Sequence, residues 1–134
     1  MTVLLDTHAA IWLATDDLAL GKRSRALAQQ ALTKNQLAIA SISFWEIAML
    51  IAKGRLQTST SPEDLRAQLL DTGITEIPLT GDIALLAVAL EGLHSDPADR
   101  FIVASAIAHR ANLVTADTTL LGWKHSLERH NAGK

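Results

Sequence analysis

Four carboxylates from distant parts of the chain are the residues whose type and placement could do chemistry. Asp6 ends the first apolar run of the sequence, and Asp117 follows the last one. Glu46 and Asp99 each fall in the first turn of an expected helix. If the apolar runs are parallel strands, the side chains just past their carboxyl ends converge on one edge of the sheet, where sites in α/β proteins usually form.

Carboxylates gathered at such an edge repel one another unless a cation lies between them. Ligand sets made only of oxygen favour a hard divalent cation such as Mg2+ or Mn2+. The pattern therefore predicts a site for Mg2+ (or Mn2+) and metal-dependent chemistry on a phosphoester.

Each carboxylate also has a local explanation. Ser43 and Glu46 have the spacing of a capping box, in which Glu46 would reach back to the start of its own helix. Asp96 is expected to cap the helix that carries Asp99, whose charge suits the helix dipole. Capping gives no reason for Asp6 to follow a buried run directly, because burying an unpaired charge costs several kcal/mol.

The elements that must position these acids follow from hydrophobic periodicity. Strands are expected at 2–5, 37–40, 74–77 and 113–115. Helices are expected at 9–14, 21–32, 43–53, 62–73, 82–90 and 97–111, with a short last helix near 120–123. The polar tail from about residue 128 is expected to be frayed. Strands that alternate with helices predict the α/β fold class, as a three-layer α/β/α sandwich around a short parallel sheet. The 134 residues should form a single domain, residues 1–134.

The composition is that of a globular protein, with 49% apolar and 19% charged residues. The absence of cysteine excludes disulfides and thiolate chemistry. We expect no signal peptide, no membrane span and a cytoplasmic location, because no basic leader or long apolar stretch is present. The net charge of −2 is unlike that of a general nucleic-acid binder, although a bound metal would offset part of it. Local basic groups are Lys22, Arg23, Arg25, Lys53, Arg55 and Arg100.

Histidines and tryptophans provide no competing site. No two histidines have helical i, i+4 spacing, which argues against a zinc site. The five are His8, His94, His109, His125 and His130. The three tryptophans, Trp12, Trp45 and Trp123, are expected in the core because they are spaced with Leu and Ile on helix faces.

The stretch 83–90 is apolar around its whole circumference. A helix packed on the sheet buries only one side, so apolar side chains on its other side would stay exposed. The stretch therefore predicts a two-fold symmetric homodimer.

Several motifs together resemble one known family. They are Leu4-Leu5-Asp6-Thr7-His8, Ser43-Phe44-Trp45-Glu46-Ile47-Ala48, Lys53-Gly54-Arg55-Leu56, Asp96-Pro97-Ala98-Asp99-Arg100-Phe101-Ile102-Val103-Ala104 and Leu113-Val114-Thr115-Ala116-Asp117. In order and spacing these motifs resemble the PIN domain, and most closely the VapC-like toxin ribonucleases of bacterial toxin–antitoxin pairs. The resemblance covers nearly the whole chain.

The resemblance implies a Mg2+- or Mn2+-dependent endoribonuclease with an RNA substrate, an antitoxin partner and a homodimeric assembly. The family's four acidic positions fall on Asp6, Glu46, Asp99 and Asp117, and all four are acidic here. They would hold the metal directly or through water. Asp96 is an additional acid beside them, either a helix cap or a metal or water contact.

Three further residues are candidates beside the acids. Thr115 resembles the family's hydroxyl position and could orient a carboxylate, and Thr7 could do the same beside Asp6. Both could equally be buried or capping hydroxyls. Arg100, next to Asp99, is the basic residue expected to contact a phosphate.

Two alternative functions stay open. A metal-dependent phosphatase or phosphotransfer domain also places acids at strand ends, but phosphatases of the haloacid type need an Asp two residues after the first, where this chain has His8. A non-catalytic PIN-like interaction module would keep the fold but should lack some of the acids.

Overall fold

All five strands in the described residues, 1–93 and 96–134 of the computed structural model, belong to one sheet with the order β3-β2-β1-β4-β5. They are β1 (Val3–Leu5), β2 (Leu37–Ala40), β3 (Thr75–Ile77), β4 (Asn112–Thr115) and β5 (Arg129–Asn131). Every neighbouring pair is parallel. All carboxyl ends of the strands therefore lie at the same edge, as the sequence predicts.

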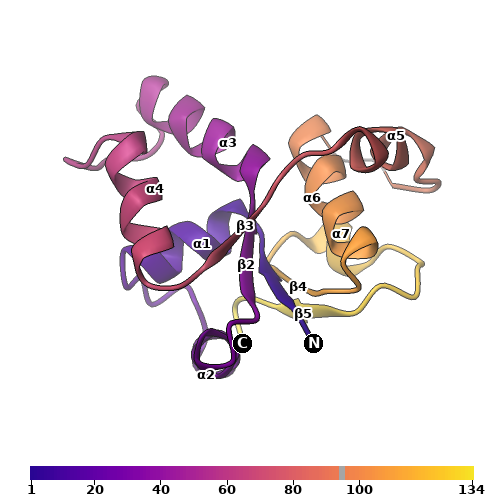
Figure 1. Ribbon diagram of the computed structural model, residues 1–134, viewed down its shortest axis with the longest axis horizontal. Helices are drawn as coiled ribbons and strands as arrows, with labels where there is room; N and C mark the ends of the chain where they lie inside the picture. Colours follow the sequence, from indigo (N-terminus) through magenta and orange to yellow (C-terminus); the bar gives the residue numbers. More distant parts are fainter. Residues whose placement is uncertain (94–95) are drawn as a thin grey trace.

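Helices cover both faces of the sheet. They are α1 (Thr7–Ala14), α2 (Lys22–Thr33), α3 (Ser41–Ala52), α4 (Pro62–Asp71), α5 (Gly81–Ala89), α6 (Pro97–Ala108) and α7 (Thr118–Leu121). Figure 1 shows α1, α3 and α4 on one side of the sheet and α5, α6 and α7 on the other. The predicted three-layer α/β/α sandwich is confirmed.

Side chains of the central strands alternate between two cores. On β1, Val3 and Leu5 pack with the layer of α1 to α4, whereas Leu4 packs with the layer of α5 to α7. Leu37 and Ile39 on β2 likewise face the first core. Because successive side chains of a strand point to opposite faces, a sheet covered on both sides needs strands that are apolar throughout.

The prediction of a frayed tail from residue 128 is wrong. Residues 129–131 form β5, which pairs with β4, and Ala132 is completely buried. The Arg129 guanidinium donates hydrogen bonds to the carbonyls of Leu120, His125 and Leu127, among others. Polar side chains suit an edge strand, so polarity alone does not indicate disorder here.

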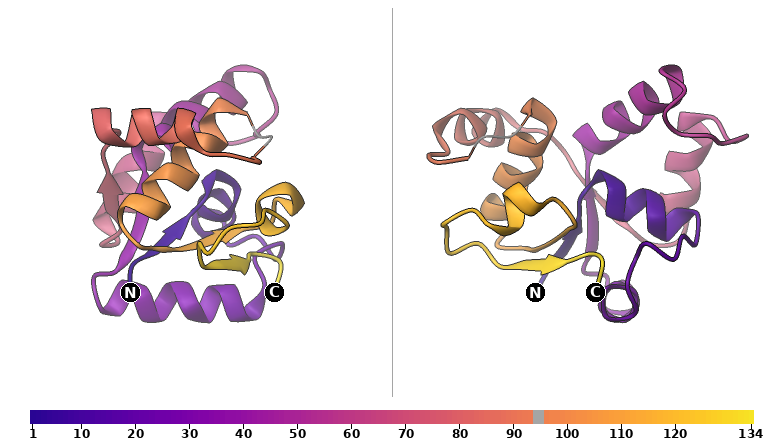
Figure 2. Two further views of the ribbon diagram at one scale, coloured as in Figure 1. Left: turned by 90° about the vertical axis from the view of Figure 1, so that its right-hand side faces the viewer. Right: turned by 180° about the vertical axis from the view of Figure 1, so that it is seen from behind.

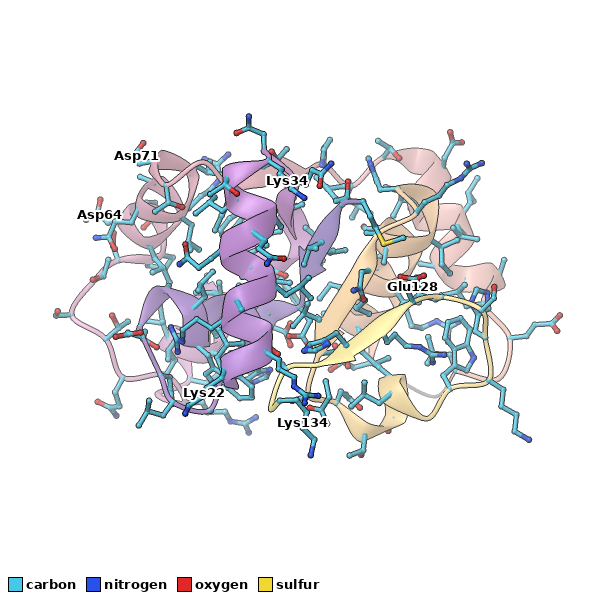
Figure 3. The ribbon with its side chains drawn as sticks, turned by 90° about the horizontal axis from the view of Figure 1, so that it is seen from below. Lys22, Lys34, Asp64, Asp71, Glu128 and Lys134 are labelled. Carbon is cyan, nitrogen blue, oxygen red and sulfur yellow. The ribbon has the colours of Figure 1, made fainter. Side chains whose placement is uncertain are left out.

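The end of the chain also closes against the start of α2. The amide of Gly21 donates to the carbonyl of Ala132 at 2.8 Å, and that of Arg23 donates to the carbonyl of Lys134 at 2.8 Å. Figure 3 shows the Lys22 end of α2 beside Lys134. A Cβ at Gly21 would lie 2.1 Å from the Lys134 carbonyl carbon, so this approach requires glycine.

Both chain ends and α2 lie at one edge of the molecule, as both views of Figure 2 show. Helix α6 ends at Ala108, earlier than the predicted Ala111, because Arg110 adopts a left-handed conformation with φ of 51°. No helix among the described residues is long and apolar enough to cross a bilayer.

Candidate metal centre

Two of the four predicted acids lie just past the end of a strand and cap the next helix. Asp6 follows β1, and its Oδ1 accepts a hydrogen bond from the Ala9 amide at 2.9 Å. Asp117 follows β4 by two residues and accepts from the amides of Thr119 and Leu120 at 2.8 and 3.3 Å. Capping uses Oδ1 in each case, so the backbone holds both carboxylates at the carboxyl edge of the sheet.

Glu46 does not form the capping box with Ser43 that was its alternative local explanation. Helix α3 begins at Ser41 with Ala40 as its cap, so Ser43 lies inside the first turn and Glu46 in the second. Ser43 is buried and accepts a hydrogen bond from the Thr7 hydroxyl at 3.0 Å. The strand runs into the helix without a loop, which moves the helix start and frees Glu46 from a capping role.

The remaining acid, Asp99, lies in the first turn of α6 beside Asp96. Asp96 is the helix cap, and its Oδ1 accepts from the Asp99 amide at 2.9 Å. Carboxylate oxygens of Glu46, Asp96 and Asp99 all lie within 4.8 Å of one another. Helices α3 and α6, from opposite faces of the sheet, thus bring three carboxylates together.

The charges in this cluster perturb one another strongly. Burial is the largest cause that raises the pKa of Asp99 from 3.8 to about 7. The other causes are the carboxylates of Asp96, Glu46, Asp117 and Asp6. Burial also raises the pKa of Asp6, with a small further rise from Glu46, while hydrogen bonds from Thr115 and the Ala9 amide and the charge of His8 oppose this rise. Asp6 and Asp117 therefore lie near enough to Asp99 to raise its pKa, but they do not belong to the group of three whose oxygens lie within 4.8 Å of one another.

One buried oxygen in the cluster lacks a partner. Glu46 Oε1 is enclosed and accepts no hydrogen bond from any described residue. A buried acceptor without a partner costs about 1–3 kcal/mol, and a cation would satisfy it. Together with a donor set made of carboxylate oxygens, this atom fits a hard divalent metal.

The other predicted site residues take structural positions. Thr115 is buried, and its hydroxyl accepts from the Asp117 amide at 3.1 Å. Thr7 is buried against Ser43. The guanidinium of Arg100 donates to carbonyls of the α5 end and the following turn, those of Ala87, Val88, Leu90 and Leu93. Because four of its five N–H groups donate to the backbone, Arg100 is not available for the phosphate contact that the sequence predicts.

No histidine among the described residues belongs to the group of candidate metal ligands. His8 is exposed on α1, with its ring centroid 6.3 Å from that of Trp12. His94 lies outside the described residues. The group of candidate ligands in the described part of the chain is entirely carboxylate.

A groove beside the cluster was missed by sequence reasoning. It has a volume of about 280 Å³ and includes Trp45, Lys53 and Arg55 together with Glu46 and Asp96. The expectation that all three tryptophans are core residues is wrong for Trp45, whose side chain is 53% exposed. The i, i+4 spacing of Trp45, Met49 and Lys53 could have indicated a helix face separate from the core face at Ile47.

Comparisons with known proteins bear on the family of this chain. The PIN domain family model matches residues 3–121. Ribonuclease VapC22 of Mycobacterium tuberculosis (strain ATCC 25618 / H37Rv) is 37% identical over 125 residues, which are 92% of this chain and 93% of that protein.

Solved structures show the same fold. A toxin-antitoxin complex from Klebsiella pneumoniae matches with a TM-score of 0.57 and 26% identity, over 87% of this chain and 88% of that one. VapBC2 from Rickettsia felis, bound to a DNA fragment from its promoter, matches with a TM-score of 0.72 and 19% identity over 98% of each chain. At that identity the second likeness concerns the fold alone.

Proposed function

The chain belongs to the PIN domain family, and on that premise we propose that it is a metal-dependent endoribonuclease, the toxin of a toxin–antitoxin pair. The observation that carries this proposal is the convergence of carboxylates from separate elements around the unpartnered Oε1 of Glu46. The 37% identity to a ribonuclease over most of both chains supports RNA as the substrate.

Mg2+ or Mn2+ would be held by Asp6, Glu46, Asp99 and Asp117, directly or through water. Asp96, whose Oδ1 is used as a helix cap, would add its second oxygen as a ligand or water contact. When bound, such a metal polarises a phosphoryl oxygen and lowers the pKa of a coordinated water.

The protein's own contribution is to hold these carboxylates in place before RNA arrives. Backbone amides fix Asp6 and Asp117, and the Thr7–Ser43 hydrogen bond joins the start of α1 to that of α3. Thr115 restrains the Asp117 backbone and donates to Asp6. Preorganised charge of this kind is effective because little reorganisation remains for the reaction.

Cleavage assays test the proposal. We expect purified protein to cut single-stranded or looped RNA at discrete positions with Mg2+ or Mn2+ and not with EDTA, because a rigid duplex cannot easily enter a pocket at a sheet edge. Duplex DNA and single-stranded DNA of the same length and sequence are the control substrates. Equal cutting of DNA would indicate a general nuclease, and no cutting of any substrate would favour a non-catalytic interaction module.

An antitoxin is the proposed protein partner, in the cytoplasm. The similar structure from Klebsiella pneumoniae, 26% identical to this chain, is a toxin-antitoxin complex. An Arg or Lys from the antitoxin could enter the acidic cluster, since a cationic side chain would compensate the carboxylates that a metal otherwise compensates.

We also propose a two-fold homodimer that buries the outer face of α5. Leu85 and Val88 on this helix are 74% and 81% exposed, which is uncommon for adjacent large apolar side chains. Light scattering at tens of micromolar should show a dimer for the wild type and a monomer for Leu85→Glu/Val88→Glu. Leu18→Glu, at an exposed loop residue outside α5, should stay dimeric, and a monomeric wild type would contradict the proposal.

A further inference from the structure

The exposed ring of Trp45 lies next to the acidic cluster. Trp45 precedes Glu46 on α3, and both line the groove of about 280 Å³. By contrast, Trp123 is buried and donates its indole N–H to the carbonyl of Glu91 at 2.9 Å. The indole N–H of Trp45 has no hydrogen-bond partner in the described parts of the chain, so nothing in the fold accounts for its position.

The groove changes character along its length. Glu46 and Asp96 lie at one end, in the acidic cluster. Trp45, Met49 and Leu50 on α3 and Pro97 and Ala98 on α6 give the groove apolar walls.

Lys53 and Arg55 form the other end of the groove. From Glu46 to Lys53 the helix rises about 10 Å. Lys53 and Arg55 are exposed, and neither makes an ion pair with any described residue. Trp45 thus lies at the acidic end, directly before Glu46 on α3, and the cationic residues lie about two helical turns further along.

We propose that the Trp45 ring stacks on an unpaired RNA base next to the scissile phosphate, while Lys53 and Arg55 bind a neighbouring phosphate. The proposal rests on the proposed ribonuclease function and adds the part of the site that selects single-stranded RNA. Aromatic side chains beside a cationic track are the usual means of binding single strands, because every base has a face on which a ring can stack.

Charge complementarity favours RNA over an apolar protein segment as the occupant. A nucleotide presents a flat apolar base between two phosphates. One phosphate would meet the metal end, and the other would meet Lys53 and Arg55. An apolar peptide would cover the apolar walls of the groove but leave both charged ends without partners.

Binding is measured first, by tryptophan fluorescence in Ca2+ so that cleavage does not interfere. A short single-stranded oligoribonucleotide should quench the emission of wild-type protein, and an abasic ribose-phosphate oligomer of equal length should not. The quenching should disappear in Trp45→Phe, which keeps a stacking ring but lacks the indole fluorophore at this position. Unchanged emission on RNA binding would overturn the proposal.

Affinity is measured next with labelled RNA. Trp45→Ala should weaken binding roughly 5- to 150-fold, the range for loss of one stacked base, and Trp45→Phe should recover most of it. Lys53→Ala/Arg55→Ala should flatten the salt dependence of binding, because fewer counterions are released. Leu18→Ala, which removes a side chain that is 92% exposed elsewhere on the surface, should bind as wild type.

Cleavage kinetics separate this proposal from the function on which it rests. Trp45→Ala should raise KM for single-stranded RNA more than it lowers kcat. If the wild type cleaves RNA and Trp45→Ala has the same KM, the base-stacking proposal is refuted but the ribonuclease function is not. The groove would then be assigned to a protein partner. RNA binding with quenching but no cleavage under any metal would refute the ribonuclease function and retain the base-binding groove.

Discussion

Replacing Asp99 with asparagine should lower metal-dependent RNA cleavage at least about 100-fold, the order of magnitude for losing one positioned charged group in an active site. Asparagine keeps the size of the side chain and removes the charge that would help to hold the metal. The measurement is the initial rate of RNA cleavage in Mg2+ and in Mn2+, with circular dichroism to show that the fold is retained.

Asp64 offers a matched control for this substitution. Like Asp99 in α6, it is the third residue of its helix α4, after a proline, and its amide donates to the side chain of the capping residue. Asp64 is exposed, does not belong to the group of three carboxylates, and is labelled at the edge of the molecule in Figure 3. Asp64→Asn should cleave as wild type. Full activity in Asp99→Asn would show that Asp99 serves only the helix dipole.

The same variant should change the pH dependence of stability in metal-free protein. The folded-state pKa of Asp99 is about 7, above the usual 3.8, so the folded protein binds the extra proton and its stability falls as pH rises between these values. Asp99→Asn removes this loss. Its melting temperature should therefore exceed that of the wild type at pH 8, and the difference should vanish near pH 4.

Saturating Mn2+ should raise the melting temperature of wild-type protein by roughly 10 °C. A ligand that binds only the folded state at 100 times its Kd adds about 2.7 kcal/mol to the free energy of unfolding, and each kcal/mol is worth several degrees in a domain of this size. The measurement is a thermal melt of EDTA-treated, antitoxin-free protein with and without added Mn2+.

Acid should reduce the Mn2+ effect, because metal and protons compete for the carboxylates. With the pKa of Asp99 near 7, the Mn2+-induced rise should grow as pH increases through neutrality and shrink at pH 5. Asp64→Asn should respond to Mn2+ as the wild type does, and Asp99→Asn should respond less. An equal rise in both variants would place the metal elsewhere, and no rise with any divalent ion would refute the metal centre.

Much of the fold and of the acidic site could be predicted because the signals are local. Apolar runs of three or four residues indicate buried parallel strands, and Asp6, Asp96 and Asp117 carry the signature of helix caps. Given parallel strands, the convergence of acids at one sheet edge follows from topology alone. The metal-binding hypothesis follows from these strand signals, cap signals and the parallel topology together.

Three-dimensional contacts decided the rest. The cap at Ala40 instead of Ser43 depends on β2 running directly into α3, and this junction leaves Glu46 Oε1 without a partner. The carbonyls that Arg100 binds become available only when the α5 end and the following turn pack beside α6.

The sequence by itself determined the alternation of strands and helices and the two-sided burial of the sheet, because each depends on neighbours within a turn or a strand, and it predicted the four acids of the site. Only the tertiary structure decided that residues 129–131 pair with β4 and that Trp45 borders a groove instead of the core. The physical reason is that the environment of a helix face or an edge strand depends on segments distant in sequence, which local periodicity does not encode.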